Sequence, residues 1–486
     1  MLVRLLIFYE VGMIEEVKVK RKTQSGVTLN RGLYRWHKWL GIICALPVVL
    51  WCLSGFMHPV MSNFFKLKPS KRRVESINVD NHDSLLSFQA ALGVLNKSKI
   101  NNAKAVMIDD SVYYQFLAAG NNHFINAESG EKLIGGDSSY AEYLARYFIQ
   151  DFNHDLISVE YIDEFDNEYL PINRYLPVYK VVFKRDDNMT LYVDVNNSRL
   201  ATLMDNAKIY YQWFFRNFHT WSFLDSDNPI RIIGVIILLM VLLISSIFGI
   251  WIYIRNWFKY KRMKSLPKLR NRKRHRQVGL ISSIFILMFS FSGIFHALLK
   301  FDLDNRYEFF LENEFETSAI NFNPFAVADM KVSNFHLVQI GQENAFRVNS
   351  TKETSFYSLE GKKINFTDDD YAKYLATTFA DKELKEVESV GLIRKFNHDY
   401  GFINKKLPVN RVNFKSENNL SVYVENNTSS LSVMVDDYKR LEGLSFSMLH
   451  KLHFLDSLGK PFRDSIVVVS ILMILLVVFF GLRTLL

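Results

Sequence analysis

The sequence predicts an α-helical membrane protein with four transmembrane helices in two pseudo-symmetric halves and two α+β domains outside the membrane. Three observations favour this fold class. The 486 residues contain four long apolar stretches, the positive charge is concentrated next to these stretches, and one pattern of histidine and glycine occurs twice. With 49% hydrophobic residues, 14% aromatic residues and two cysteines, the composition excludes disordered, collagen-like and disulfide-rich proteins.

Four stretches are long enough to cross a bilayer, which takes about 20 apolar helical residues. We expect transmembrane helices at residues 36–61, 230–255, 277–299 and 465–486. The second and fourth are runs of Ile, Leu, Val and Phe, whereas the first and third also contain Ser, Gly and His. Polar residues inside a membrane helix are costly, so they indicate function. The two cysteines, Cys44 and Cys52, fall inside the first stretch and are expected to act as small hydrophobic residues.

The positive charge predicts the orientation. The formal net charge is +9, but eleven Lys and Arg and no acidic residue lie between Arg255 and Arg276, and without that segment the net charge is −2. The basicity is therefore local, and we expect no nucleic-acid partner. Because basic loops stay in the cytoplasm, the N-terminal segment 1–35, the loop 256–276 and both termini are predicted to be cytoplasmic. In a bacterium this would be a multi-pass protein in the lipid of the inner membrane, with no cleavable signal peptide evident.

The two long segments, residues 62–229 and 300–464, are then periplasmic. Residues 84–96 have the apolar spacing of a helix, and alternating residues with turn signals predict strands and hairpins. These predicted strand regions are residues 105–118, 123–135, 179–197 and 419–427. We expect small antiparallel sheets, each with a helix.

The chain contains an internal duplication. The pattern His-x3-Gly-x12-Ser-Gly-x2-His spans residues 37–58 and recurs at residues 275–296, an offset of 238. Further matches join FNHD at 152–155 to FNHD at 396–399, LPINR at 170–174 to LPVNR at 407–411, and FHTWSFLD at 218–225 to LHKLHFLD at 449–456. On this alignment eight of the twelve histidines correspond. We expect two copies of one unit, related by an approximate two-fold axis along the membrane normal.

Six histidines are the candidate functional residues. His37 and His58 are 21 residues apart, which is about 31 Å of helix, so they should lie near opposite faces of the bilayer. We expect one cluster inside and one outside: His37 with His275, and His58, His296, His219 and His450. Neutral imidazoles from facing helices can clamp a haem, and glycines on the same helix face would let a flat macrocycle or another helix approach.

Other interpretations remain open for these residues. A histidine at a membrane boundary can lie at the level of the lipid headgroups or relay protons, and Ser-Gly pairs commonly mediate helix packing. A zinc site is less favoured, because neither Cys nor carboxylates are suitably placed. His154 and His398 in the FNHD motifs are better explained by a turn, and His453 is a candidate for an extra ligand in one half. We expect His82, His123 and His336 to lie at the surface.

These motifs carry a family resemblance. The HKWLG sequence at residue 37, the Ser-Gly pair of the first span, the four spans, and strand patterns such as YYQFL at 113–117 and HFINAESGEKL at 123–133 resemble the PepSY-associated transmembrane helix family. The resemblance covers about residue 34 to the C-terminus. It implies PepSY domains outside the membrane, and members of this family include inner-membrane ferric-siderophore reductases that bind b-type haems through membrane histidines. The resemblance supports six histidines as candidate iron ligands. The first four are His37, His58, His275 and His296, and His219 and His450 come next.

The leading hypothesis is therefore a transmembrane haem reductase that passes electrons to a ferric siderophore or another periplasmic acceptor. Two b-type haems are expected, although six histidines permit up to three sites, with the outer four paired within or across the halves. The cytoplasmic segments are too short for a nucleotide-binding domain, so quinol or a separate cytoplasmic reductase would be the electron donor. The alternative is a non-catalytic PepSY membrane protein that binds or inhibits a periplasmic peptidase or assists a transporter.

Overall fold

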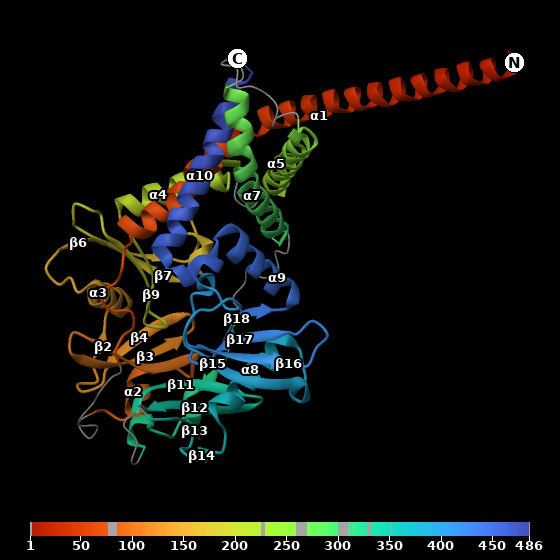
Figure 1. Cartoon of the computed structure of the whole chain (residues 1–486). Coiled ribbons are helices and arrows are strands. Elements are labelled where there is room, and N and C mark those ends of the chain that lie inside the picture. Colours follow the sequence, from red (N-terminus) through yellow and green to blue (C-terminus); the bar gives the residue numbers. More distant parts are fainter. Residues whose placement is uncertain are drawn as a thin grey trace. The chain divides into compact units, whose positions relative to one another are not determined.

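The computed structural model describes residues 2–75, 85–224, 229–258, 270–299, 310–311, 313–327, 332–350 and 352–485, with the backbone alone for residues 2–30. The chain divides into two compact units, each built from separate parts of the sequence. The first unit comprises residues 1–65, 210–303 and 442–486, and the second comprises residues 66–209 and 304–441. Figure 1 labels the helices and strands of both units.

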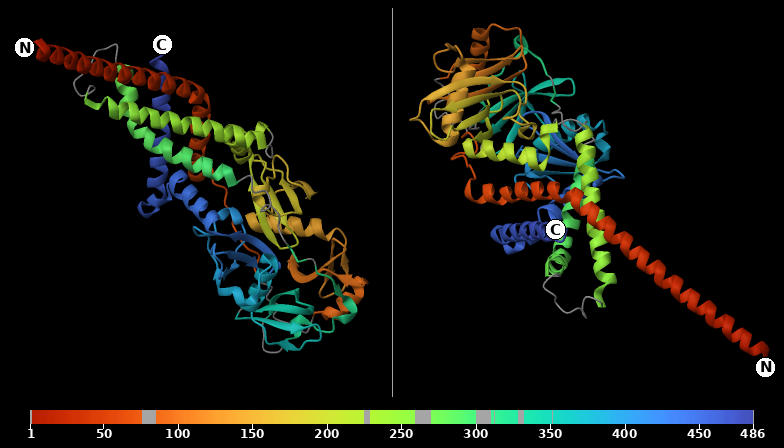
Figure 2. Two further views of the ribbon diagram at one scale, coloured as in Figure 1. Left: turned by 90° about the vertical axis from the view of Figure 1, so that its right-hand side faces the viewer. Right: turned by 90° about the horizontal axis from the view of Figure 1, so that it is seen from above.

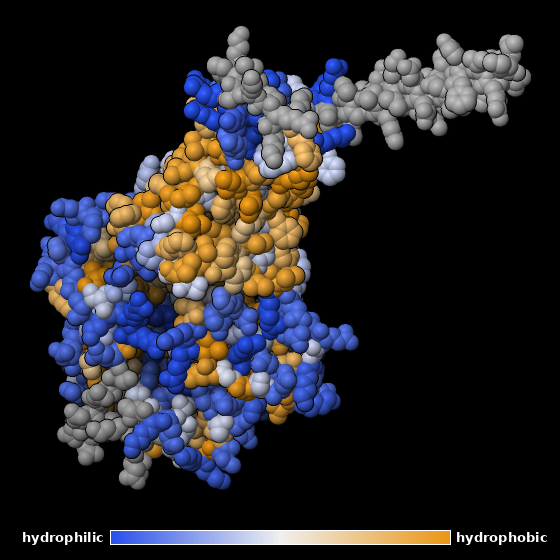
Figure 3. All heavy atoms as spheres, in the orientation of Figure 1, coloured by the Kyte–Doolittle hydropathy of each residue, from blue (hydrophilic) through white to orange (hydrophobic). Residues whose placement is uncertain are grey.

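Within the described residues, four helices of the first unit are long and apolar enough to cross a membrane. These are the Arg31–Phe64 part of α1 (Leu2–Phe64), α5 (Pro229–Arg255), α7 (Arg270–Leu299) and α10 (Lys460–Arg483). At most 28% of the apolar window of each helix is buried inside the protein, so most apolar side chains face outward. Figure 3 shows hydrophobic residues gathered over these helices. The four predicted spans are confirmed. Each helix begins before its predicted span, and α10 ends at Arg483, three residues before the predicted end.

The four helices pack in a reciprocal pattern. α1 packs against α5 and α10, and α7 packs against the same two helices (Figure 2). Small residues let membrane helices approach closely. Cys44 and Cys52 are both buried in this core with Ile471 and Ile474, as expected for small hydrophobic residues. The buried serines of the four helices are Ser54, Ser245, Ser246, Ser282, Ser283, Ser290, Ser292 and Ser470.

Short helical segments precede α5 and α10. Helix α4 (Asn206–His219) leads toward α5, and α9 (Asp437–Ser445) leads toward α10. α9 continues into a single π-helical turn, η10 (Phe446–His450), and then into the 3-10 helix η11 (His453–Leu458). Both α4 and η10 end at a histidine.

The two long segments that are expected to lie outside the membrane are called the external segments. The first contains two antiparallel sheets, each with its strands in chain order. A short helix, α2 (Phe88–Leu95), begins at Ser87, whose side chain accepts a hydrogen bond from the backbone N–H of Ala90. The first sheet consists of β2 (Asn102–Ile108), β3 (Ser111–Ala118), β4 (Asn121–Asn126) and β5 (Lys132–Leu133). Helix α3 (Gly136–Ile149) follows. The second sheet consists of β6 (Leu156–Ile162), β7 (Val178–Phe183), β8 (Thr190–Asp194) and β9 (Arg199–Met204).

The second external segment repeats the order of a four-stranded sheet, a helix and a second four-stranded sheet. Its first sheet consists of β11 (Val332–Ile340), β12 (Glu343–Ser350), β13 (Thr354–Ser358) and β14 (Lys363–Ile364). Helix α8 (Asp368–Ala380) begins with a capping box between Thr367 and Asp370. The second sheet consists of β15 (Val387–Ile393), β16 (Val409–Phe414), β17 (Ser421–Glu425) and β18 (Ser430–Val435). The predicted α+β character of both segments is confirmed.

The two external segments share a core. The sheets β2–β5 and β11–β14 pack together around aromatic rings, and Phe88 of α2 lies 5.4 Å from both Phe116 and Phe335 between ring centroids. The short strands β1 (Lys99–Ile100) and β10 (Phe315–Glu316) also pair across the segments. Helix α3 packs on the sheet β6–β9, and α8 packs on β15–β18. Residues 66–209 and 304–441 therefore form one folded unit rather than two separate domains.

Two motif matches from the sequence are in the wrong register. FNHD at 152–155 precedes β6, whereas FNHD at 396–399 follows β15, which occupies the position of β6 in the second segment. The turn that Asn397 forms, by accepting the backbone N–H of residues 399 and 400, is formed in the first segment by Asp166. Asp and Asn both make this turn, so identical letters misled the alignment.

The same error affects the LPINR and LPVNR match. The 3-10 helix η2 (Pro171–Asn173) has its equivalent in η9 (Phe402–Asn404), whereas LPVNR runs into strand β16. The corrected offset in the external segments is 231, which still pairs His219 with His450. His154 and His398 do not correspond, so six histidines, not eight, occupy matching positions.

Candidate functional site

The histidine pair that is expected at the inner face, called the inner pair, joins α1 to α7. The imidazole rings of His37 and His275 have centroids 6.1 Å apart and planes inclined at 53°. His37 Nδ1 lies 2.9 Å from the carbonyl oxygen of Ser245 in α5, and His275 Nδ1 lies 3.0 Å from that of Val477 in α10. Because a carbonyl only accepts, both Nδ1 atoms carry the proton, and Nε2 of each ring has the lone pair.

A glycine lies beside each inner histidine. Gly249 and Gly481 stand four residues after Ser245 and Val477, so their N–H groups bond the same helix carbonyls. A Cβ on Gly249 would lie 3.1 Å from Cε1 of His37, and a Cβ on Gly481 would lie 3.2 Å from Cε1 of His275. The absence of a side chain therefore lets each imidazole reach its carbonyl.

The outer pair consists of His219 at the end of α4 and His450 at the end of the π-helical turn. Their ring centroids are 6.2 Å apart and their planes are nearly perpendicular, at 88°. His219 stacks on Phe215, with centroids 4.4 Å apart, and its Nδ1 lies 3.1 Å from Oγ of Ser54. His450 stacks on Phe446 at 4.9 Å. Single π-helical turns occur frequently at functional sites.

His450 is enclosed by protein. Burial, and to a smaller extent the nearby side chains of His219, His296 and Lys451, lower the pKa of its imidazole to about 3, although a hydrogen bond with the backbone of Phe289 opposes this shift. The ring is therefore neutral at pH 7, and its Nδ1 is buried without a hydrogen-bond partner among the described residues.

His58 and His296 are not in ring contact with one another in the described structure. His296 Nδ1 lies 2.6 Å from Oε1 of Glu442, and its ring stacks on Phe446 at 4.5 Å. Phe446 thus contacts both His296 and His450. His58 lies instead among charged side chains of the segment before and at the start of α10: Lys451, Lys460, Arg463 and Asp464.

The glycines of the repeated motif contact neighbouring helices. A Cβ on Gly55 would meet Ile471 of α10 at 3.7 Å, and one on Gly293 would meet Leu239 of α5 at 3.2 Å. Gly279 approaches Val477 in the same way at 3.2 Å, whereas Gly41 has nothing within 4 Å. Gly55, Gly279 and Gly293 therefore support helix packing.

A family model for the PepSY-associated TM region matches residues 34–484. The chain belongs to this family. No curated protein matches the chain. Membership of the PepSY-associated TM region family and the four apolar helices together make the chain a multi-pass membrane protein.

The grouping of the possible ligand side chains limits which metal or cofactor the histidine pairs could bind. The described residues contain no group of three or more His, Cys, Asp or Glu side chains placed to bind a metal ion. Each histidine pair instead brings two imidazole rings together, with centroids 6.1 Å apart in one pair and 6.2 Å apart in the other. Such a pair suits a group that already supplies the other ligands of its metal.

Three contacts of the site were not found from the sequence. Glu442 has Tyr211 at the matching position of the other half, so the duplication gave no signal for it. Gly249 and Gly481 do match, and an alignment of the second span with the fourth would have shown them at one offset with Ser245 and Val477.

The remaining histidines lie elsewhere. His154 Nδ1 lies 2.9 Å from Asp151 in the turn after α3, and His398 is exposed in its own turn, so the turn interpretation is confirmed for both. His453 Nδ1 contacts Asp456 at 2.6 Å and Arg463 at 2.8 Å. The list of surface histidines was wrong for His336, whose Nδ1 is buried, because its side chain packs inside the shared external unit. His82 lies outside the described residues.

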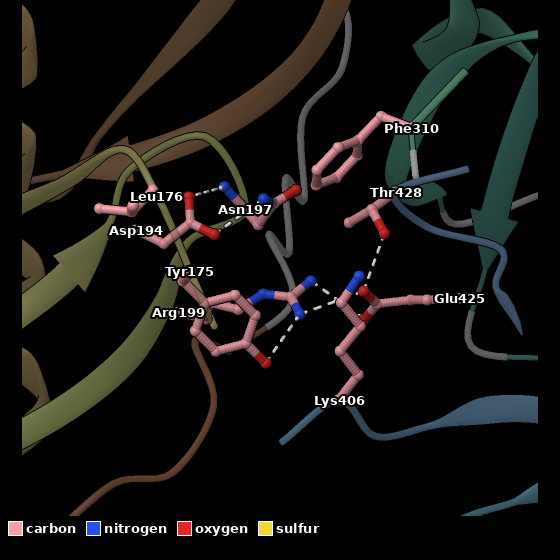
Figure 4. A pocket seen from close by; sticks show the side chains of 9 residues that line it. All are labelled: Tyr175, Leu176, Asp194, Asn197, Arg199, Phe310, Lys406, Glu425 and Thr428. Atoms are coloured by element: carbon pink, nitrogen blue, oxygen red, sulfur yellow. Dashed lines mark hydrogen bonds and ion pairs between the residues drawn. The ribbon is translucent and has the colours of Figure 1, made fainter. Parts of the chain in front are cut away.

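The external unit contains a small polar pocket, drawn in Figure 4. Arg199 of β9 donates two hydrogen bonds to Glu425 of β17, at 3.1 and 3.0 Å. Burial alone would raise the pKa of Glu425, but Arg199 and Lys406 lower it below its usual value. Two acids, Asp194 and Glu425, face two cations in this pocket, so the charges balance and the pocket closes around its own ion pair.

Proposed function

We propose that this protein is a haem-binding reductase of the bacterial inner membrane, which moves electrons to a periplasmic acceptor such as a ferric siderophore. One observation carries the proposal: two separate pairs of imidazoles, His37 with His275 and His219 with His450, have nearly equal centroid separations of 6.1 and 6.2 Å. Metal–nitrogen bonds of about 2.0 Å on both sides place the centres of two imidazoles on one metal about 6 Å apart.

The hydrogen bonds of the inner pair support iron ligation. A ligand histidine usually donates its other ring N–H to a carbonyl or carboxylate, which fixes the tautomer and the ring orientation. The bonds of His37 to Ser245 and of His275 to Val477 are of this kind, and both leave the lone pair on Nε2. The two half-sites use the same device on different helices. This supports an internal duplication with an approximate two-fold axis along the membrane normal.

The residues of the outer pair also fit a haem. His450 is neutral, and its buried Nδ1 has no partner among the described residues. The imidazole has a hydrogen bond with the backbone of Phe289, which it would exchange for a bond to iron. Phe215 stacks on the ring of His219 and Phe446 stacks on the ring of His450, so both imidazoles are shielded from water. Bound haem supplies a one-electron iron couple. His219 and His450 would hold the iron between neutral imidazoles, and the aromatic rings stacked on them would keep it in apolar surroundings.

The position of the two pairs along the chain supports transfer across the bilayer. His37 and His275 follow or lie within basic runs, which remain on the cytoplasmic side, so both termini and the loop 256–276 would be cytoplasmic. His219 and His450 follow the long external segments, which would be periplasmic. The donor would be quinol or a separate reductase.

The test uses the purified full-length chain in detergent. A difference spectrum of the reduced and oxidised protein should have the absorption bands of b-type haem, and chemical assay should give two haems per chain. His275→Ala should lose the inner haem, and His219→Ala should lose the outer one. His453→Ala, a histidine outside both pairs, is the matched control and should keep both. A colourless wild-type protein would overturn the proposal and favour the alternative, a PepSY membrane protein that binds a peptidase or assists a transporter.

A further inference from the structure

The two outer histidines differ in one hydrogen bond. Ser54 of α1 lies 3.1 Å from Nδ1 of His219. The matching residues in the second half are Ser292 of α7 and His450. Both Ser292 Oγ and His450 Nδ1 are buried without a hydrogen-bond partner among the described residues. One half therefore makes a serine–histidine bond. In the other half neither Ser292 Oγ nor His450 Nδ1 has a partner among the described residues, and the imidazole of His450 is hydrogen-bonded to the backbone of Phe289 instead.

The proton of the Ser54 hydroxyl determines what this bond does. Ser54 Oγ donates to the carbonyl of Leu50 at 2.8 Å, within its own helix. A hydroxyl has one proton and two lone pairs, so Ser54 Oγ accepts the Nδ1–H of His219. The bond therefore fixes His219 in the tautomer whose Nε2 carries the lone pair, as the carbonyls of Ser245 and Val477 do for the inner pair.

Ser292 lies where its hydroxyl could fix the tautomer of His450, as Ser54 does for His219. Phe289 contacts the ring of His450, with centroids 5.6 Å apart, and Ser292 lies three residues later on the same face of α7. In the first half, Trp51 and Ser54 have this same spacing, and Trp51 Nε1 donates to the backbone carbonyl of His219. Both serines are at most 1% exposed.

Ser292 is also unusual among the serines of its helix. Ser282, Ser283 and Ser290 each donate to a helix carbonyl three or four residues earlier. Ser292 makes no such bond to a described residue. A buried hydroxyl without a hydrogen-bond partner destabilises the protein, so a partner for Ser292 would remove this penalty.

We propose that Ser54 and Ser292 are the positioning residues of the outer histidine pair, and that Ser292 accepts the Nδ1–H of His450 when Nε2 of that ring binds haem iron. This inference rests on the proposed function. It gives the Ser-Gly pairs two separate roles, because the glycines pack helices while the serines orient imidazoles. It also predicts that His450 turns its ring on binding, whereas His219 is already held.

The experiment isolates the outer haem. In a full-length His275→Ala background, which lacks the inner haem, we compare Ser292→Ala, Ser292→Thr and the control Ser290→Ala. The readouts are haem affinity and the electron paramagnetic resonance spectrum of the oxidised haem, which depends on the angle between the two imidazole planes. Ser292→Ala should bind haem about 10-fold more weakly or worse and change the spectrum. Ser292→Thr, which keeps the hydroxyl, should restore both, and Ser290→Ala should match the background.

The outcomes separate this inference from the proposed function. Wild-type protein without haem would overturn both. Wild-type protein with two haems, together with a Ser292→Ala variant whose haem affinity and spectrum match the background, would overturn the role of Ser292 and leave the proposed function intact. Ser54→Ala provides an independent second test and should weaken the same haem. If neither serine variant changes the spectrum, the positioning role is excluded.

Discussion

Gly249 lies so close to His37 that a Cβ at this position would be 3.1 Å from Cε1 of the imidazole. The contact joins α5 to α1 at the carbonyl of Ser245, which His37 also reaches. A membrane helix has little reason to keep a glycine for its own stability, since glycine costs about 0.5–1 kcal/mol relative to alanine in a helix. The position of this glycine is therefore explained by the ring beside it.

We predict that Gly249→Ala displaces the ring of His37 by a few tenths of an ångström. The variant should bind haem more weakly at the inner pair and with unchanged affinity at the outer pair. Gly234 is the matched control, because it lies on the same helix and has nothing within 4 Å of its Cβ position. Gly234→Ala should keep both haems. Titration of each variant with haem measures the effect, and equal inner-site affinity in both variants would contradict the prediction.

Arg199→Ala should destabilise the external unit by about 3–5 kcal/mol, because it leaves the buried carboxylate of Glu425 without its partner. The double variant Arg199→Met with Glu425→Leu should recover most of this loss, since it removes both charges. Denaturant unfolding of the full-length protein, followed by the fluorescence of its aromatic residues, gives the comparison. The exposed pair Lys71 and Glu75 is the control, and Lys71→Ala should cause no measurable loss.

Acid should destabilise the external unit through His336. Burial, together with the smaller effect of the cations Arg347, Lys104 and Arg199, lowers the pKa of His336 to about 3. The unfolded chain takes up this proton near pH 6.5, so stability is full above that pH and falls as the pH drops from 6.5 toward 3, by at most about 1.4 kcal/mol per pH unit. His336→Gln should flatten this slope, as measured by unfolding at several pH values. A slope equal to that of the control His398→Gln, at an exposed histidine, would refute the assignment.

Glu442→Ala should lower the thermal stability of the membrane unit more than Glu442→Gln does. The bond from His296 to Glu442 is short, at 2.6 Å, and charge-assisted hydrogen bonds contribute about 1.5–3 kcal/mol. Glutamine keeps an acceptor oxygen for His296 Nδ1, whereas alanine leaves the ring N–H without one. Melting temperatures of the two variants decide the point, and equal values would mean that the bond does not stabilise the fold.

The sequence predicted the membrane helices and the inner histidine pair for clear physical reasons. About 20 consecutive apolar residues have few alternatives to a membrane helix, and the matching spacing in two spans placed His37 and His275 at one level of the bilayer. The approach of His219 to His450 also followed from the duplication.

The same spacing did not determine which way a side chain faces. His58 and His296 were expected to come together because they lie at one level, but His296 binds Glu442 and His58 lies among charged residues. Residue spacing gives height along a helix, whereas its rotation depends on packing against neighbours. Glu442 could not be found at all, because nothing in the other half repeats it.

The π-helical turn at Phe446–His450 makes the two sides of the outer site unequal in freedom. His219 ends an uninterrupted α-helix and is held by Ser54 and Phe215, whereas His450 ends a wider turn and its Nδ1 is bonded to nothing among the described residues. A flat molecule that enters between the two rings would contact one imidazole that is held in place, His219, and one that can change its orientation, His450. Insertion and release would then require movement on one side only, and residues 446–450 would set their rate.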